Sequence, residues 1–333
     1  MFMEDKIVFS IITPVYNRSD CIGRCLDSVV KAIKKYTGTG DFTGIEHVVV
    51  DDGSFDTTAS IVESYLYKYP HIKFIKFESN KGTNAARNAA IKAASGKMCV
   101  ILDSDDYFRD TALIDMISVV RKQPEYRHYM FSPDDMQPYY NDNPYLKGCE
   151  QKVLTYSDFL SGNINFDFIH VCDREILLKY PFDENLRVYE GVFFLLFYKE
   201  AQKMLFTNKV VTIRERNRED SVSLETIRTS VNVIKRNMKS NELKLEYFQD
   251  DLIALGMKER LYAIRLSLLE NYVLMERYEL AQKLVVQMRR PKNKRDLLLR
   301  VFYTFRSGKL LCLLLRSFLS VKYHLLKKDM KVG

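Results

Sequence analysis

The chain has 333 residues, 47% of them hydrophobic and 28% charged, with 13 Gly and 8 Pro, a composition that excludes a disordered or low-complexity protein. This length allows one large α/β domain with an appendage. The net charge of +8 comes from residues 289–333, which hold thirteen Lys/Arg and two Asp, whereas residues 1–288 hold 38 basic and 41 acidic residues. Because the positive charge is confined to this tail, we expect no nucleic-acid partner.

Apolar strands alternate with amphipathic helices along the first third of the chain. Strands are predicted at 7–14, 46–50, 73–77 and 97–102, and helices at 20–36, 57–69 and 83–94. This alternation is typical of βαβ units and predicts a largely parallel sheet. Right-handed crossovers then place the loops that follow the strands along one edge of the sheet.

Four polar loops meet at that edge, namely Pro14–Asn17, Asp51–Ser54, Asn80–Gly82 and Asp103–Asp106. Open α/β sheets bind ligands at the carboxyl ends of their strands, so we expect one polar pocket there. No Gly-x-Gly-x-x-Gly follows the first strand, and the chain has no Gly-Lys-Ser/Thr phosphate loop. The sequence therefore argues against the usual dinucleotide and P-loop sites.

Three carboxylates, Asp103, Asp105 and Asp106, follow the fourth predicted strand. Carboxylates this close repel one another unless a cation joins them, and hard oxygen ligands suit Mg²⁺ or Mn²⁺ that carries substrate phosphates. An Asp-x-Asp site for a metal and a diphosphate is one interpretation. The other is a solvated acidic turn that caps the next helix.

The order and spacing of four motifs carry a family resemblance: Thr13-Pro-Val-Tyr-Asn17, Val50-Asp-Asp-Gly-Ser54, Asn80-Lys-Gly82 leading to Ala86-Arg-Asn88, and Leu102-Asp-Ser-Asp-Asp106. Over about residues 7–215 the chain resembles the family 2 glycosyltransferases of GT-A fold. The resemblance implies a single α/β/α sandwich with a mainly parallel sheet. It also implies an Mn²⁺ or Mg²⁺ cofactor and the transfer, with inversion, of a sugar from a nucleotide-diphospho-sugar.

The same resemblance assigns roles to residues at the edge of the sheet. Asp52 would bind uracil, Asp103 would contact the ribose or metal-bound water, and Asp105 would be the direct metal ligand. The positions expected to line the nucleotide are Thr13, Pro14, Tyr16, Asp52, Asn80, Gly82, Arg87 and Asp103.

Physical chemistry gives some of these residues a second interpretation. Tyr16 forms a wall for the base or ribose, or it is simple packing. Gly82 permits a tight turn before a helix whose N-terminus favours anions, and Arg87, further along that helix, could face the diphosphate. Alternatively, Arg87 forms a salt bridge to Asp103 or Asp106 inside the fold.

An inverting transfer needs a general base that takes a proton from the acceptor hydroxyl. By the resemblance, this base comes from a Glu-Asp pair followed by an aromatic residue, whereas this chain has Glu190 followed by Gly191. We take Glu190 as the catalytic candidate; the alternative is that it only caps the helix predicted from about Gly191. His170, on a predicted strand, is either a substitute base or a buried structural histidine.

Beyond the first domain the pattern becomes helical. The expected division is a catalytic domain over residues 1–220, with a nucleotide-sugar half at about 1–110 and an acceptor half at about 111–220, a helical region over 221–288, and a basic amphipathic tail over 289–333. We find no internal repeat. The apolar runs of the tail are shorter than the about 20 residues that span a bilayer. Residues 295–330 are therefore predicted to lie in a membrane interface, or else to fold onto the enzyme or a partner.

The six cysteines are scattered and include no Cys-x-x-Cys pair, so neither a zinc site nor a disulfide framework is expected. The first residues lack the charged and apolar regions of a signal peptide. These observations predict a cytoplasmic protein, and the tail places it at the inner face of the cell membrane.

The function that follows is a metal-dependent inverting glycosyltransferase of surface polysaccharide synthesis. Its donor is expected to be UDP-linked and its acceptor a glycan or a lipid-linked sugar; a homo-oligomer is left open. The alternative, suggested by Gly191, is a non-catalytic subunit that binds a nucleotide sugar or assembles a complex. A phosphatase using Asp103 as nucleophile is disfavoured, because Tyr107 replaces the Thr or Val of that motif.

Overall fold

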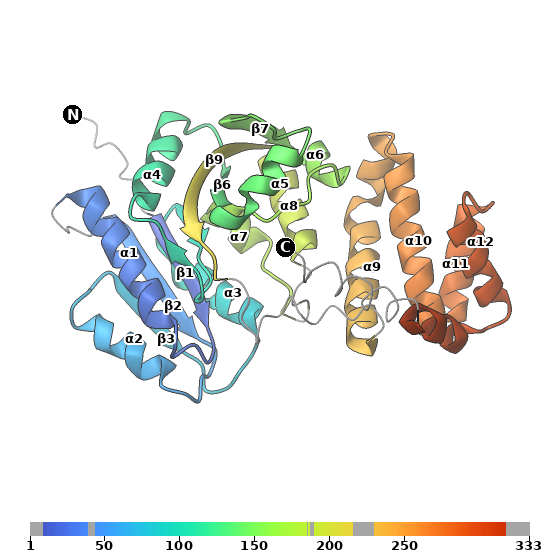
Figure 1. Cartoon of the computed structure of the whole chain (residues 1–333), viewed down its shortest axis with the longest axis horizontal. Coiled ribbons are helices and arrows are strands. Elements are labelled where there is room, and N and C mark those ends of the chain that lie inside the picture. Colours follow the sequence, from blue (N-terminus) through green and yellow to red (C-terminus); the bar gives the residue numbers. More distant parts are fainter. Residues whose placement is uncertain (1–8, 39–43, 185, 187–189, 216–229, 318–333) are drawn as a thin grey trace, which may run out of the picture. The chain divides into compact units, whose positions relative to one another are not determined.

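The computed structural model describes residues 9–38, 44–184, 186, 190–215 and 230–317 (Figure 1). The chain divides into two compact units, Met1–Arg218 and Glu219–Gly333. Each is described by itself.

The first unit contains one mixed sheet of nine strands among its described residues, in the order β3-β2-β1-β4-β8-β6-β9-β5, with β7 paired to β9. The strands are β1 (Phe9–Val15), β2 (Ile45–Asp51), β3 (Ile72–Lys76), β4 (Met98–Ile101), β5 (Tyr107–Phe108), β6 (His128–Pro133), β7 (Gln151–Thr155), β8 (Ile169–Asp173) and β9 (Lys203–Ile213). The first four are mutually parallel, as predicted. The second half of the sheet differs, because β8 runs antiparallel to both β4 and β6.

Helices cover both faces of this sheet (Figure 1). They are α1 (Ile22–Thr37), α2 (Thr58–Leu66), α3 (Thr83–Ala93), α4 (Ala112–Lys122), α5 (Gln137–Asp142), α6 (Tyr156–Leu160), α7 (Arg174–Lys179) and α8 (Gly191–Ala201). The largest core joins one face of the sheet to α1, α2 and α4. Helix α3 contacts β1, β2 and α7 but supplies no residue to that core, so it lies on the other face. The expected α/β/α architecture is confirmed.

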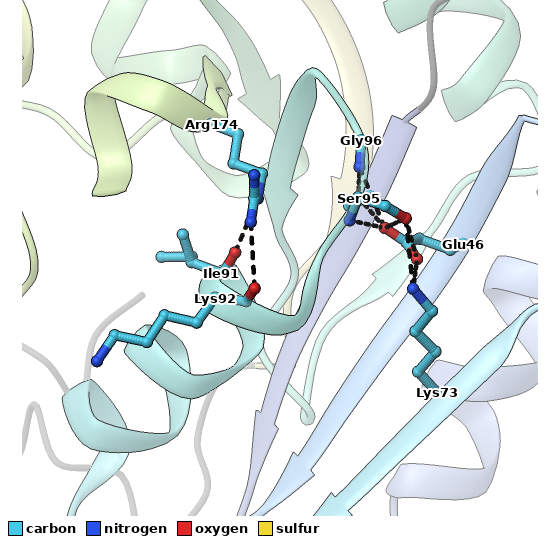
Figure 2. Close-up of polar contacts among 8 residues, drawn as sticks. Glu46, Lys73, Ile91, Lys92, Ser95, Gly96 and Arg174 are labelled. Atoms are coloured by element: carbon cyan, nitrogen blue, oxygen red, sulfur yellow. Dashed lines mark hydrogen bonds and ion pairs between the residues drawn. The ribbon is translucent and has the colours of Figure 1, made fainter. Parts of the chain in front are cut away.

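A buried carboxylate ties the strands together at the amino end of the sheet, opposite the polar loops. Glu46, at the start of β2, accepts hydrogen bonds from Ser10 (2.5 Å) and from the main chain of Ser95 and Gly96, and pairs with Lys73 on β3 (2.5 Å; Figure 2). Nearby, Arg174 donates to the main-chain oxygens of Ile91 and Lys92 and so closes the C-terminus of α3 (Figure 2). These contacts fix the strands whose opposite ends carry the candidate site.

The second unit is helical, with α9 (Val231–Ala254), α10 (Lys258–Leu274), α11 (Tyr278–Met288), α12 (Lys294–Thr304) and a further helical stretch over 308–317. Three of its connections use the same turn. Gly256, Glu276 and Arg306 each have positive φ, and the next amide bonds to a carbonyl five residues earlier: Met257 to Leu252, Arg277 to Tyr272 and Ser307 to Phe302. This is a Schellman ending. Helical hairpins therefore recur here, although the sequence showed no repeat.

Among the described residues, no helix has the length and apolar character needed to cross a membrane.

Candidate active site

The loops after β1 and β2 are bonded to one another. The main-chain amide of Asn17 donates to Ser54 Oγ (2.8 Å), and the amide of Phe55 donates to Asn17 Oδ1 (3.1 Å). Asp51 Oδ1 accepts from the amide and the hydroxyl of Ser54, and so caps this turn. The two loops therefore form one rigid piece of the rim.

The loop after β2 is also locked to the loop before α3. Gly53 has φ +73°, and a Cβ there would lie 2.6 Å from the main-chain carbon of Ser79, so only glycine fits. Asp52 is 2% exposed, and its two oxygens accept the amides of Lys81 (2.7 Å) and Gly82 (2.9 Å). The carboxylate predicted to bind uracil thus already organises the loop that leads into α3.

The predicted residues of the β1 loop lie at two depths. Thr13 is fully buried, with Oγ1 2.9 Å from His47 Nε2, and Pro14 is buried within β1 opposite Val50. Tyr16, in contrast, is exposed and meets the more exposed ring of Phe55 edge to face, with centroids 6.2 Å apart. The surface that a base could contact is therefore this aromatic pair, and we leave Thr13 out of the proposed site.

The Asn80–Gly82 loop is held by the carboxylate of Asp52. Asn80 is exposed and Gly82 is half-buried, with φ +98° and no atom closer than 3.9 Å to the position of a Cβ. The main-chain amide of Gly82 donates to Asp52. Fewer free amides at the N-terminus of α3 therefore remain for a bound anion.

Arg87 on α3 joins carboxylates that are far apart in the sequence. Its Nη2 lies 2.9 Å from Asp103 Oδ1, after β4, and its Nη1 lies 3.4 Å from Glu190 Oε1, before α8. Asn84 Oδ1 accepts from the same Nη1 at 3.3 Å. The salt bridge that was one interpretation of Arg87 is therefore present, and it places the predicted base beside the Asp-x-Asp motif.

Arg87 and its neighbouring carboxylate Asp103 favour each other's charged forms. Burial disfavours the charged guanidinium, but Asp103 and Glu190 outweigh that effect and raise the pKa of Arg87. Partial burial likewise opposes ionisation of Asp103, yet the attraction of Arg87 lowers the pKa of Asp103. Asp103 is consequently a carboxylate, and it keeps about half of its side chain exposed (48%), available to a ligand.

Glu190 precedes α8, and its main-chain oxygen accepts from Phe193 and Phe194, but its side chain makes no capping hydrogen bond. The carboxylate turns to Arg87 instead and is 19% exposed. The capping interpretation is therefore wrong for the side chain. At Gly191 a Cβ would have no neighbouring atom within 4 Å among the described residues, so the backbone leaves room for a side chain to begin at the position where the family pattern has aspartate.

The Asp103–Asp106 loop is held by two more arginines that the sequence analysis missed. Arg24 on α1 donates to the main-chain oxygen of Asp105 (3.4 Å) and stacks over Tyr107. Arg214, after β9, lies 3.8 Å from Asp106 Oδ2 and 3.1 Å from Asp167 Oδ2. Arg214 follows the end of a strand, so the expectation that residues after strand ends meet at one edge of the sheet could have identified it. Arg24 lies within a helix, and no sequence pattern points to it.

The carboxylates of the Asp103–Asp106 loop suit a metal ion that binds together with a substrate diphosphate. In the described parts of the chain no group of three or more His, Cys, Asp or Glu side chains could hold a metal ion. Asp103 and Asp105 are nevertheless partly exposed carboxylates on one short loop. Mg²⁺ and similar ions are commonly bound by one or two carboxylates, with diphosphate oxygens and water completing the shell. These residues suit that arrangement.

His170 takes the structural role. Its Nδ1 lies 3.0 Å from His128 Nε2, and its ring stacks on Phe194 with centroids 4.2 Å apart. Burial, together with the neighbouring His128, lowers the pKa of His170 well below its usual value, so the ring is neutral.

Comparison with known proteins identifies the family. Residues 10–179 match the model of glycosyl transferase family 2. The chain belongs to this family. It is 26% identical over 272 residues to the GalNAc(5)-diNAcBac-PP-undecaprenol beta-1,3-glucosyltransferase of Campylobacter jejuni, which covers 79% of this chain and 84% of that protein. Several other curated relatives, also named glycosyltransferases, are matched over less than a third of their own length.

Solved structures of this family's fold are similar as well. Staphylococcus aureus TarS 1–349 in complex with UDP-GlcNAc matches with a TM-score of 0.58 and 18% identity, over 79% of this chain and 81% of that one. The mannosyltransferase PcManGT of Pyrobaculum calidifontis, in complex with GDP-Man and Mn²⁺, matches with a TM-score of 0.57 and 15% identity, over 93% and 86%. At these identities the likeness establishes the GT-A fold.

Proposed function

We propose that this family 2 member is a metal-dependent inverting glycosyltransferase. It would move a sugar from a nucleotide-diphospho-sugar, UDP-linked, to a glycan or lipid-linked acceptor in surface polysaccharide synthesis. The observation that carries the proposal is Arg87, whose guanidinium joins Asp103 of the donor-side loop to Glu190 of the acceptor side. The lipid-linked acceptor is supported by the name of the Campylobacter jejuni relative.

The donor would lie along the rim of the sheet. The exposed pair Tyr16 and Phe55 offers an aromatic surface for the base, and Asp52, which holds the amides of Lys81 and Gly82, would bind uracil as the family resemblance implies. Asp105, with Asp103 beside it, would hold Mn²⁺ or Mg²⁺. When bound, that ion neutralises the charge that grows on the leaving nucleoside diphosphate.

Glu190 would take the proton of the acceptor hydroxyl as that oxygen attacks the anomeric carbon. Arg87 contacts the Glu190 carboxylate and would keep a positive charge between this base and a diphosphate bound beside Asp103. A base on one side and a leaving group on the other are what a single inverting displacement requires.

A second candidate function rests on Gly191. The first residue of α8 carries no side chain where the family pattern has its aspartate, which suits a subunit that binds donor without turning it over. The two functions differ in one measurable property, the release of nucleoside diphosphate.

The test is release of nucleoside diphosphate by the purified full chain with Mn²⁺, a panel of nucleotide sugars and lipid-linked or glycan acceptors. The enzyme proposal expects release that chelation of the metal, Asp105→Ala and Glu190→Gln each abolish, while the exposed-surface control Glu175→Gln leaves it unchanged. Gly191→Asp in the Glu190→Gln background should restore part of the activity if a carboxylate here is the base. Metal-dependent donor binding without release from any donor would instead favour the binding subunit.

A further inference from the structure

The last described part of the second unit exposes an apolar surface; residues 318–330 of the segment predicted to lie in a membrane interface are outside the described residues. On α12, the turn that follows it and the helical stretch 308–317, seven large apolar side chains are exposed, including Phe305 at 75% and Leu313 at 59%. We call these residues the apolar strip; they are Leu297, Leu298, Val301, Phe305, Leu310, Leu313 and Leu314.

The strip is separate from the hydrophobic core. On α12 its members recur at spacings of three and four residues, which places them on one face, whereas Leu299 and Phe302 on the other face are buried in the core. The stretch 308–317 repeats the pattern, because Leu311 is in the core and Leu310 and Leu314 are exposed.

Positive charge surrounds the strip. Residues 289–317 contain nine Lys/Arg and one acidic residue, Asp296. Asp296 is fully buried and bonded to Arg300 (2.7 Å) and Tyr262, so it offers no negative charge to the surface. The exposed basic residues are Arg289, Arg290, Lys292, Lys294, Arg295, Arg306, Lys309 and Arg316. Two of them are paired with acidic residues of α10, Lys292 with Glu259 and Arg295 with Glu270.

We propose that the apolar strip and its basic surround dock on an anionic lipid bilayer. Leucine and phenylalanine on one face with flanking Lys and Arg are the features of helices that lie in a membrane interface. Each basic side chain near such a surface adds attraction, which salt weakens. A second copy of the chain is a poorer occupant, because a twofold interface would press the same basic surfaces together.

The proposal goes beyond sugar transfer, and its test does not depend on activity. The purified full chain is sedimented with vesicles of phosphatidylcholine, alone or mixed with phosphatidylglycerol. Binding is expected to the mixed vesicles and to fall with salt. The strip variant Leu298→Gln/Phe305→Gln/Leu313→Gln should reduce the partition coefficient by about tenfold or more. The control Val231→Gln/Ile253→Gln/Leu255→Gln changes three apolar side chains that are also exposed but lie outside the basic segment, and it should leave the coefficient within about twofold.

The charge variant Arg290→Gln/Lys294→Gln/Lys309→Gln should remove the preference for phosphatidylglycerol while the chain stays folded by circular dichroism. Retained binding in the strip variant would overturn the proposal, as would equal binding to both vesicle types that the charge variant does not change. Absence of vesicle binding together with a dimer that the strip variant dissociates would assign the surface to a second copy. Nucleoside diphosphate release on a soluble acceptor should be the same in all these variants, which separates this test from that of the proposed function.

Discussion

Replacing Glu46 by glutamine removes a buried charge while keeping the size of the side chain. Burial alone would raise the pKa of Glu46, but the hydrogen bonds from Lys73, Ser10 and Ser95 outweigh it and lower the pKa from 4.5 to about 2. Since one pKa unit is worth about 1.4 kcal/mol, this shift corresponds to about 3 kcal/mol of folding stability at neutral pH. Glu46→Gln should forfeit most of it, because glutamine resembles the protonated acid.

The sign with pH follows from the lowered pKa. The stabilisation is present above the unfolded value of 4.5 and is lost as the pH falls toward about 2. The difference between wild type and variant should therefore be constant from neutral pH down to about pH 5 and shrink below it.

Urea unfolding followed by circular dichroism measures this difference, with an unchanged m-value expected. Hydrogen exchange of β1 and β2 assigns the loss to the first unit. The control is Glu200→Gln, which breaks the exposed ion pair with Lys179 and should shift the midpoint far less. Equal shifts in the two variants, or a stability of Glu46→Gln within about 0.5 kcal/mol of wild type, would refute the reasoning.

Three further outcomes are expected. Arg87→Lys should lower kcat/KM on the order of a hundredfold with the fold intact by circular dichroism, because a lysine does not bridge two carboxylates as a guanidinium does; unchanged kinetics would count against the proposed site. Gly53→Ala should destabilise by about 2 kcal/mol or more and Gly191→Ala by little, since only the former places a Cβ against backbone at positive φ; equal melting temperatures would contradict this. Burial lowers the pKa of His47 and of His128 to about 3, so below pH 6.5 the unfolded chain takes up protons that the native one does not, and each should cost about 2 kcal/mol at about pH 5; a urea midpoint that is flat from neutral to about pH 5 would rule this out.

The motifs predicted which loops lie at the edge of the sheet, but not all of the hydrogen bonds and ion pairs that join them. Apolar runs and strand ends depend on local sequence, so the strands and their polar loops could be placed in order. The salt bridge of Arg87 to Asp103 was one predicted interpretation, but the contact of Arg87 with Glu190 and the bonds of Asp52 to the amides of Lys81 and Gly82 join residues far apart in the chain, which spacing does not report. For the same reason Thr13, a member of a recognised motif, is buried against His47 rather than exposed at the rim.

In the second unit the sequence predicted the helices but not the turn that joins them. Periodicity predicted its helices, but the recurring turn escaped notice because its positive-φ position is occupied by Gly256, Glu276 and Arg306 in turn. A non-glycine residue there costs only about 1 kcal/mol, so the backbone geometry is kept while the sequence signal is lost. Helical spacing likewise does not distinguish a leucine in the core from one at the surface, since both faces of α12 are apolar. The charge of the flanking residues carries the information that periodicity lacks, and it is the reason to test a membrane before a protein partner.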